Sequence, residues 1–232
     1  MTGPLRGATW PDVAAAPRRV LLVPTGSLEQ HGPHLPLATD TLVAEGVAAR
    51  VHAARPALGL APAVPFGASG EHEGFPGTIS IGTDALRTVV VEVVRYAAAE
   101  WDTLVVVNGH GGNADALRQA AELCRYEGRR LEIVHCALAG MDAHAGRAET
   151  SMLLHLHPEL VRSDRVEAGS TAPMTELLPR LRAGGVRAVS PNGVLGDPRG
   201  ANAEEGAAWV ERLVAKVLAT VDPLLDAPAV QP

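Results

Sequence analysis

Four side chains that can bind a metal ion lie within twelve residues of one another, in the segment GSLEQHGPHLPLATDT: Glu29, His31, His34 and Asp40. Imidazole and carboxylate are ligands that Zn, Mn and Fe accept in proteins. Glu29 and His31 are two residues apart, and in extended backbone such residues point to the same side. Asp40 just precedes an apolar-periodic segment, and its two oxygens can bridge two ions. Solvated loop residues are an equal alternative for this segment alone, and His34 is either a support for a ligand or purely structural.

A second segment, NGHGGN at 108–113, combines glycines with a histidine directly after an apolar run. Glycine permits positive φ and close backbone approach, so a tight turn or an anion-binding nest is the simpler interpretation. Neither needs an imidazole, which makes His110 a candidate metal ligand. Gly111 and Gly112 are candidate substrate-binding residues, because their backbone N–H groups can stabilise an oxyanion.

The third segment is HAGRAETS at 144–151. Glu149 falls in the first turn of an expected helix, where the macrodipole alone can explain a carboxylate. His144 precedes that turn and can move protons near neutral pH, with a structural role as the alternative. Arg147 can receive a peptide carboxylate through its planar fork, or it forms a surface salt bridge.

A glycine-flanked loop at 70–74, GEHEG, is expected to cover the cleft formed by these segments. Glu71 and His72 are candidate substrate contacts, and a solvated loop is the alternative. The remaining histidines have no motif around them and are set aside: His52, His135, His155 and His157.

The elements that must position these loops alternate between strand and helix. Apolar runs predict strands at 20–23, 60–64, 103–107 and 131–137. Periodicity and turn residues predict helices at 39–54, 83–101, 114–127, 149–156, 174–182 and 203–221. Thr39 or Asp40, and Asn113, are the expected N-caps. Continuous apolar strands separated by helices are typical of a mostly parallel sheet covered on both faces, whose ligands bind beyond the carboxyl ends of the strands. We therefore expect the loops 26–40, 108–113 and 140–151 to converge at that edge.

Composition limits the class of protein. The 232 residues suffice for one α/β domain, predicted over 1–232 with an N-terminal extension at 1–18 and a frayed tail at 226–232. A net charge of -6 argues against a nucleic-acid partner. Cys124 and Cys136 lack CxxC spacing, which is typical of free thiols in the cytoplasm. No signal-peptide core and no apolar run of about 20 residues are found, so we predict a cytoplasmic protein with no membrane partner.

Four blocks resemble, in the same order, those of the creatininase (creatinine amidohydrolase) family: GSLEQHGPHLPLATDT, GEHEGFPGTISIG, VVVNGHGGN and HAGRAETS. The resemblance implies a three-layer α/β/α amidohydrolase with two divalent ions (Zn, Fe or Mn) per subunit, commonly assembled as a hexamer. It implies that Glu29 and His31 each bind one metal and that Asp40 bridges both. By the same resemblance, His110 is a further ligand and His144 is the catalytic histidine.

Two features depart from the creatinine-cleaving member of that family. That enzyme has a metal-binding glutamate two residues after the Asn-Gly-His histidine, where this chain has Gly112. Glu149 is the predicted substitute, and we assign it to both the metal ligands and the catalytic residues. The tryptophans that flank the creatinine pocket also have no counterpart in the site blocks, since the three in this chain are Trp10, Trp101 and Trp209.

The GEHEGFPGT block and the ending RAGGVRAVSPNGVLGDPRGA resemble one branch of the family, the peptidases of the mycofactocin system, which remove a C-terminal Val-Tyr dipeptide from a radical-modified precursor peptide. We therefore predict a binuclear metal-dependent peptidase in which His144 protonates the leaving amine. Two alternatives stay open: a hydrolase or deformylase of the same family acting on a small cyclic or nucleobase-like amide, and a non-catalytic metal-dependent binding or assembly protein. A phosphate-binding protein is disfavoured, because NGHGGN lacks the Lys-Ser/Thr pair of a P-loop.

Overall fold

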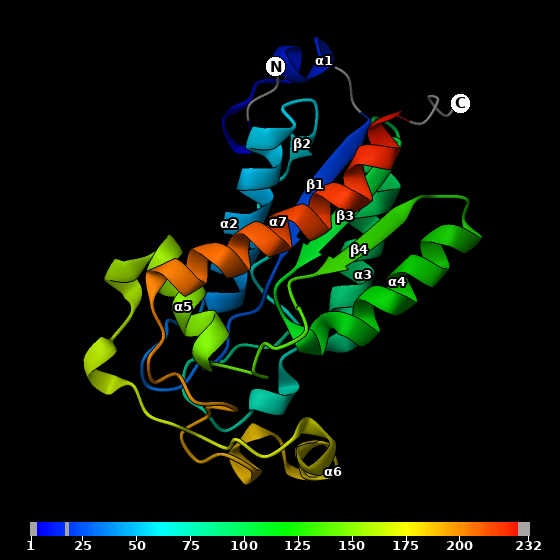
Figure 1. Ribbon diagram of the computed structural model, residues 1–232. Helices are drawn as coiled ribbons and strands as arrows, with labels where there is room; N and C mark the ends of the chain where they lie inside the picture. The colour runs from blue at the N-terminus through cyan, green and yellow to red at the C-terminus, as the bar shows by residue number, and fades with distance from the viewer. Residues whose placement is uncertain (1–3, 17–18, 227–232) are drawn as a thin grey trace.

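The computed structural model describes residues 4–16 and 19–226 of the chain. Its sheet has four parallel strands in the order β2-β1-β3-β4 (Figure 1). Their bounds are Val20–Thr25 for β1, Gly59–Leu60 for β2, Thr103–Asn108 for β3 and Leu131–His135 for β4. The helices are Trp10–Ala14 (α1), Thr39–Ala54 (α2), Gly82–Ala97 (α3), Ala114–Tyr126 (α4), Arg147–Leu156 (α5), Met174–Gly184 (α6) and Ala203–Asp226 (α7). Short 3-10 turns are Leu5–Gly7 (η1), Gly70–His72 (η2), Gly111–Asn113 (η3), Pro158–Leu160 (η4), Ser163–Arg165 (η5) and Val186–Ala188 (η6).

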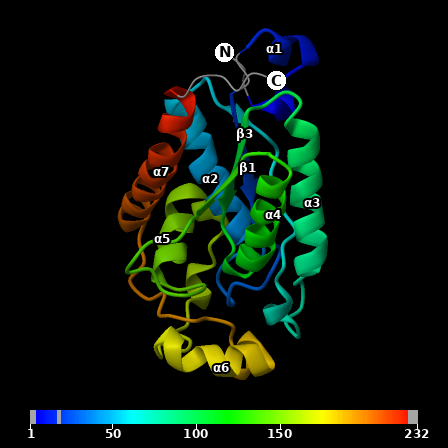
Figure 2. The same cartoon turned by 90° about the vertical axis from the view of Figure 1, so that its right-hand side faces the viewer.

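The sheet is the middle of three layers. Figure 2 shows α2, α5 and α7 on one face and α3 and α4 on the other. Each face has its own apolar core, with Leu22 and Val105 in one and Leu104 and Leu117 in the other. Strands β1 and β3 are buried at every position because helices cover both of their faces, which explains their continuous apolar sequence. The predicted three-layer α/β/α class is confirmed.

Several predicted boundaries were wrong. The strand expected at 60–64 is reduced to β2 and one bridge from Val64 to Thr25, because Pro62 lacks the N–H that a ladder needs. The helix expected to reach Trp101 ends at Ala97, and the buried Trp101 ring instead packs on Gly59. The strand expected to reach residue 137 ends at His135.

The predicted terminal segments are only partly described. Within the extension expected at 1–18, residues 1–3 and 17–18 lie outside the described residues, and the rest contains η1 and α1. In the predicted tail, residues 227–232 lie outside them as well, and Asp226 ends α7 rather than belonging to a frayed segment. No helix of the described ranges is long and apolar enough to span a membrane.

The strand order creates a natural binding crevice. The chain leaves β1 through α2 to reach β2 on one side, and leaves β3 through α4 to reach β4 on the other. The connections after these neighbouring strands therefore diverge at the carboxyl edge, a topological switch point where α/β proteins bind ligands.

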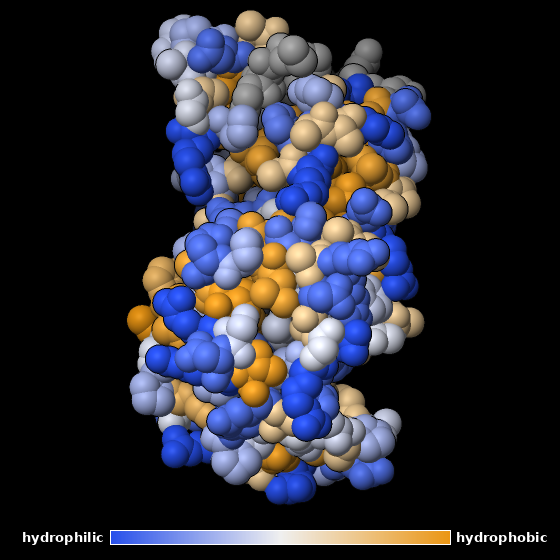
Figure 3. Space-filling model, turned by 60° about the vertical axis from the view of Figure 1, so that its left-hand side comes forward, coloured by the Kyte–Doolittle hydropathy of each residue, from blue (hydrophilic) through white to orange (hydrophobic). Residues whose placement is uncertain are grey.

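On the outside, apolar patches alternate with hydrophilic side chains over the face shown in Figure 3.

Candidate functional site

The start of α2 lies directly against the carboxyl ends of β1 and β3. A Cβ at Gly109 would overlap the backbone carbonyl of Asp40, so glycine permits this approach. The predicted caps were wrong: the N-cap of α2 is Ala38, because the Thr39 hydroxyl donates to the Pro36 carbonyl at 2.7 Å. Asp40 thus lies inside the first turn of α2, where the helix dipole favours a carboxylate.

Asn113 links three of the loops at this edge. Its Oδ1 accepts from the Ala68 amide at 2.8 Å, and its Nδ2 donates to the Gly26 carbonyl and to Asn108 Oδ1, each at 3.0 Å. Asn113 is the N-cap residue of α4, as predicted, but its side chain makes no capping hydrogen bond. The side chain instead joins the loops that follow β1, β2 and β3.

Glu29, Asp40 and two histidines form a buried cluster at this junction. Asp40 Oδ1 lies 3.0 Å from His31 Nε2, and Asp40 Oδ2 lies 3.2 Å from His110 Nδ1. Glu29 Oε2 lies 3.1 Å from the same His110 nitrogen. Both Glu29 oxygens and Asp40 Oδ2 are buried without a well-formed hydrogen bond from any described residue. Buried carboxylate oxygens left in this way are costly, and divalent cations satisfy them, so the residues present fit a metal centre.

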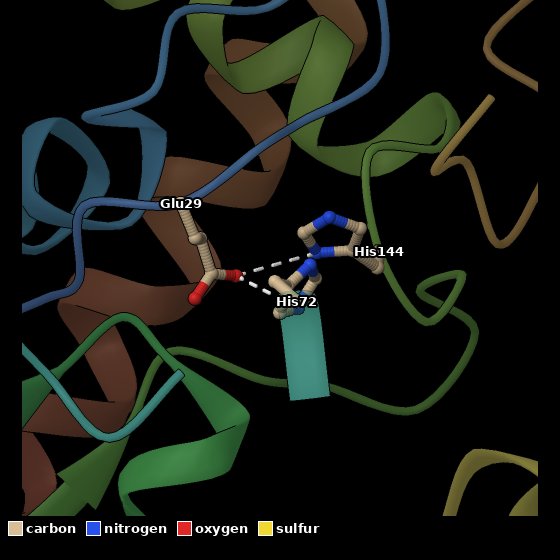
Figure 4. A group of neighbouring side chains, drawn as sticks. All are labelled: Glu29, His72 and His144. Carbon is tan, nitrogen blue, oxygen red and sulfur yellow. Dashed lines mark ion pairs between the residues drawn. The ribbon is translucent and has the colours of Figure 1, made fainter. Parts of the chain in front are cut away.

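Two further histidines face the other oxygen of Glu29 (Figure 4). His72 Nε2 lies 3.2 Å and His144 Nδ1 lies 3.7 Å from Glu29 Oε1. Their rings are 4.5 Å apart, and the His144 ring is 4.3 Å from that of His31. His72, which the sequence indicated only as a substrate contact, is 3% exposed and belongs to this cluster. The sequence feature that could have indicated this role is the Glu-His pair that His72 forms with Glu71 in a loop flanked by glycines.

Glu149 reaches the cluster from the first turn of α5, as predicted for its position in the helix. Its Oε2 lies 3.9 Å from His31 Nε2 and accepts a hydrogen bond from the Ala145 amide at 2.6 Å. Ala145 has a φ of 51°, a left-handed conformation that costs about 1–3 kcal/mol for a residue with a side chain. Single ligand atoms of His31, His144 and Glu149 all lie within 4.8 Å of one another.

Gln30 was not singled out from the sequence, although it lies between two candidate ligands. Its Nε2 donates to the Gly193 carbonyl at 3.0 Å and its Oε1 accepts from the Gly32 amide at 2.9 Å, which fixes the amide. The same Nε2 lies 2.9 Å from His72 Nδ1 and 3.0 Å from His144 Nε2, and the backbone carbonyl of Gln30 lies 2.9 Å from His144 Nε2. His144 therefore carries its proton on Nε2, which leaves Nδ1 free to face Glu29. His72 accepts at Nδ1 and directs its Nε2–H to Glu29.

The four histidines of the cluster differ in charge. Burial opposes protonation of His31, but the Asp40 carboxylate outweighs it and raises the pKa of His31 to about 9. Burial likewise opposes protonation of His110, and Glu29 with Asp40 raises the pKa of that ring well above its ordinary value. Burial lowers the pKa of His72 to about 4, and burial together with the neighbouring His31 lowers that of His144 well below its ordinary value.

The three buried carboxyl groups differ as well. Burial, reinforced by the Asp40 charge, raises the pKa of Glu29 to about 7. Burial also raises the pKa of Glu149 to about 7. Burial acts in the same direction on Asp40, but His31 and His110 outweigh it and hold the pKa of Asp40 well below its usual range. Asp40 is therefore the anion around which the cluster is organised.

The remaining predicted residues lie around this cluster. His34 is buried and its Nε2 lies 2.9 Å from the Thr150 hydroxyl, beside Glu149. Glu71, at the edge of the cluster, has its Oε1 3.3 Å from His110 Nε2. Gly111 and Gly112 form η3 directly after His110.

Arg147 lies outside the cluster. Its Nε is 2.8 Å from Glu205 Oε2, and it lines a separate cavity of about 790 Å³ together with Trp209. Trp10 is 82% exposed on α1, Trp101 is buried against Gly59, and Trp209 lines the cavity beside Arg147.

Known proteins resemble this chain over most of its length. The creatininase (creatinine amidohydrolase) family profile matches residues 6–221. The mycofactocin precursor peptide peptidase of Mycobacterium ulcerans is 54% identical over 207 residues, which cover 86% of this chain and 80% of that protein. The protein of the same name in Mycolicibacterium smegmatis is 53% identical over 205 residues, covering 86% and 81%. The creatinine amidohydrolase of Pseudomonas putida is 31% identical over 194 residues, covering 68% and 73%.

Solved creatininase structures have the same fold. One described as creatininase with Mn has a TM-score of 0.80 at 25% identity, covering 98% of this chain and 100% of that chain. A crystal structure of creatinine amidohydrolase has a TM-score of 0.78 at 27% identity, covering 97% and 98%. A mutant creatininase described as Zn-Zn type has a TM-score of 0.79 at 25% identity, covering 97% and 100%.

Proposed function

The chain belongs to the creatininase family of amidohydrolases, and on that premise we propose that it is a metal-dependent peptidase acting on the mycofactocin precursor peptide. The observation that carries the proposal is the identity of 54% and 53% with two peptidases of that name, against 31% with a creatinine amidohydrolase. None of the three tryptophans stands in the sequence blocks that form the cluster, which supports a substrate other than creatinine. The product we propose is the C-terminal Val-Tyr dipeptide of the modified peptide.

We propose two cation positions per subunit. Glu29, Asp40 and His110 would hold one ion, and His31, Asp40 and Glu149 would hold the other. Asp40 suits the shared role because its two oxygens face His31 and His110 separately, at 3.0 and 3.2 Å. The ligand types accept Zn, Fe or Mn. When bound, divalent cations here would supply Lewis acidity toward the scissile carbonyl and toward water.

The residues of the chain would carry out proton transfer, positioning and oxyanion stabilisation. His144 rests neutral, so the proton that it gives to the departing amine must first be accepted at Nδ1, the atom that faces Glu29. The Gln30 carbonyl holds Nε2–H throughout. The His72 ring lies against the same carboxylate, with Nε2 3.2 Å from Glu29 Oε1. Gly111 and Gly112 offer backbone N–H groups at the start of η3 for the developing oxyanion, and Arg147 would have to release Glu205 before it could bind a peptide carboxylate.

A direct test is to incubate the metal-loaded protein with the radical-modified precursor peptide and to detect products by mass spectrometry. We expect release of Val-Tyr, and none from a peptide whose scissile amide is N-methylated. A panel of small cyclic and nucleobase-like amides is run beside it. Turnover of the panel without cleavage of the peptide would favour the other family activity. Metal-loaded protein that is inert toward both sets would instead favour a non-catalytic binding or assembly role.

We also propose that subunits assemble into a homo-oligomer, with a hexamer as the expected state. Large apolar side chains remain exposed on the single chain, including Tyr96 at 82% and Val93 at 37% on the outer side of α3. Light scattering coupled to size-exclusion chromatography measures the mass directly. A mass of one chain, 24.1 kDa, would contradict the proposal.

A further inference from the structure

Gly112 leaves a space that a carboxylate from another loop occupies. A Cβ built on Gly112 would overlap Glu71 Oε1 and His110 Nε2, and it would lie 2.6 Å from the Ala68 carbonyl oxygen. The neighbouring Gly111 meets nothing within 4 Å of such an atom. The two adjacent glycines therefore differ: any side chain at 112 would displace both the Glu71 carboxylate and the His110 ring that it faces, whereas one at 111 would enter open space.

The carboxylate of Glu71 acts on the outer side of the His110 ring. Its Oε1 lies 3.3 Å from His110 Nε2, and the Ala68 carbonyl lies at the same distance from that nitrogen. The other ring nitrogen, Nδ1, faces Glu29 and Asp40 at 3.1 and 3.2 Å. Since the two nitrogens of an imidazole point to different sides of the ring, Glu71 lies outside the cation positions and is not a direct ligand there.

The backbone around Glu71 holds it in this place. Glu71 is the middle residue of η2, and the next residue, His72, is buried against Glu29. A Cβ at Gly185, which has a φ of 68°, would come within 2.6 Å of the Glu71 carbonyl, so the segment before η6 packs directly on η2. The Glu71 side chain is 35% exposed and needs no movement to reach His110.

We propose that Glu71 is a positioning residue of the metal centre, and that Gly112 is glycine because this carboxylate needs its space. Glu71 accepts the Nε2–H of His110, which fixes the ring and keeps Nδ1 as the nitrogen that meets the cation. Carboxylates that hold the far nitrogen of a ligating histidine orient the ring and increase its basicity. From the sequence, Glu149 was expected to replace the family glutamate that would stand at position 112. In the structure Glu149 contacts His31, and the carboxylate next to Gly112 is that of Glu71.

This inference rests on the metal dependence proposed above, and metal affinity tests it without any substrate. Dissociation constants for Mn²⁺ and Zn²⁺ are measured by chelator competition on the wild-type chain and on Glu71→Ala and Glu71→Gln. We expect affinity to fall by about 10–100-fold in Glu71→Ala, the range found for groups that support ligating histidines, and by less in Glu71→Gln, which keeps an acceptor oxygen. The matched control is Glu73→Gln, which removes a charge from the same loop at an exposed position and should leave the affinity unchanged.

A second pair of variants tests the role of the space. Gly112→Ala should weaken metal binding like Glu71→Ala, whereas Gly111→Ala should keep the wild-type affinity. Circular dichroism confirms that each variant is folded. Proton NMR of ¹⁵N-histidine-labelled protein gives an independent readout: the Nε2–H of His110 should exchange slowly in the wild type and in Glu73→Gln, and rapidly in Glu71→Ala.

Wild-type metal affinity together with a slowly exchanging His110 signal in Glu71→Ala would overturn the inference. So would equal losses in Gly111→Ala and Gly112→Ala. A wild-type chain that binds no metal would overturn both this inference and the proposed function. Tight metal binding that depends on Glu71, without hydrolysis of the precursor peptide, would overturn the proposed function alone.

Discussion

The buried cluster has two halves that are equally hidden from water but opposite in charge. In the acidic half, His31 and His110 face Asp40 and have raised pKa values. In the amide half, His72 and His144 face Gln30 and have lowered pKa values. The exposed fractions do not separate the pairs: 0% and 4% in the acidic half, 3% and 7% in the amide half.

Burial alone therefore does not decide the state of these rings; the partner does. A carboxylate in a low-dielectric site stabilises imidazolium, whereas an amide offers no charge and burial then favours the neutral ring. The acidic half holds protons that cations can replace. The amide half keeps a neutral base ready for proton transfer. Glu29 contacts both halves and couples them.

Replacing Asp40 should have the largest effect, because it removes the anion of the acidic half. Asp40→Ala is expected to lose both metals and all measurable turnover, and breaking a buried ion pair costs about 3–5 kcal/mol of stability. Metal content by atomic emission and urea unfolding measure these effects. Asp40→Asn, which preserves the shape, should lose the metals as well. Full metal content in Asp40→Ala would contradict the shared role of Asp40.

Replacing His144 should affect chemistry alone. His144 lies in the amide half and is in neither proposed ligand set, so His144→Ala is expected to keep its metals while turnover falls by about 10²–10⁴-fold. Single-turnover cleavage and atomic emission on one preparation separate the two effects. Loss of metal in this variant would mean that His144 contributes to metal binding, like the residues of the acidic half. Near-normal turnover would refute its role in proton transfer.

The acidic half should also make metal binding depend on pH. In the metal-free protein the pKa of His31 is about 9, so at pH 7 a cation must displace its proton. Affinity should then rise with pH between 7 and about 9, by up to about tenfold per pH unit for each proton displaced, and the proton of His110, whose pKa is also raised, adds to this slope. Glu29 and Glu149, with pKa values of about 7, add to the slope only below that pH. Calorimetry in buffers of different ionisation enthalpy counts the protons released, and an affinity that is constant from pH 7 to 9 would contradict this account.

The acidic half was largely predictable from the sequence, whereas in the amide half His144 was predicted and the places of His72 and Gln30 were not. Glu29 and His110 follow strongly apolar strands, and parallel strands bring the loops at their carboxyl ends together whatever the details of those loops. His72 reaches the cluster only because the loop after β2 folds back, through a bridge between Leu28 and Ile79. No periodicity encodes such a contact.

Competing hydrogen bonds explain the other differences between the predictions and the structure. Thr39 and Asn113 have the side chains of good N-caps, but the Thr39 hydroxyl is bonded to the Pro36 carbonyl and Asn113 Oδ1 accepts from the Ala68 amide. Gln30 is neutral and has no distinctive spacing, so its role appears only when Gly193, far along the chain, fixes its amide. These competitions depend on tertiary contacts, which local propensity does not contain.

The smallest expected effect gives the sharpest test of the comparison, because it replaces the side-chain amide that His72 and His144 face. Gln30→Glu presents a carboxylate to His72 and His144 in the place of the amide. If the partner sets the state of the ring, the pKa of His144 should rise by about 1–3, as for a histidine beside a carboxylate. Because His144 must be unprotonated to accept its proton, the acidic limb of the kcat–pH profile should move to higher pH, and kcat on that limb should fall about tenfold for each pH unit that the limb moves. Gln119→Ala removes a remote amide on α4 and serves as the control. An unmoved limb in Gln30→Glu would mean that burial, rather than the partner, keeps His144 neutral, and the two halves would differ for another reason.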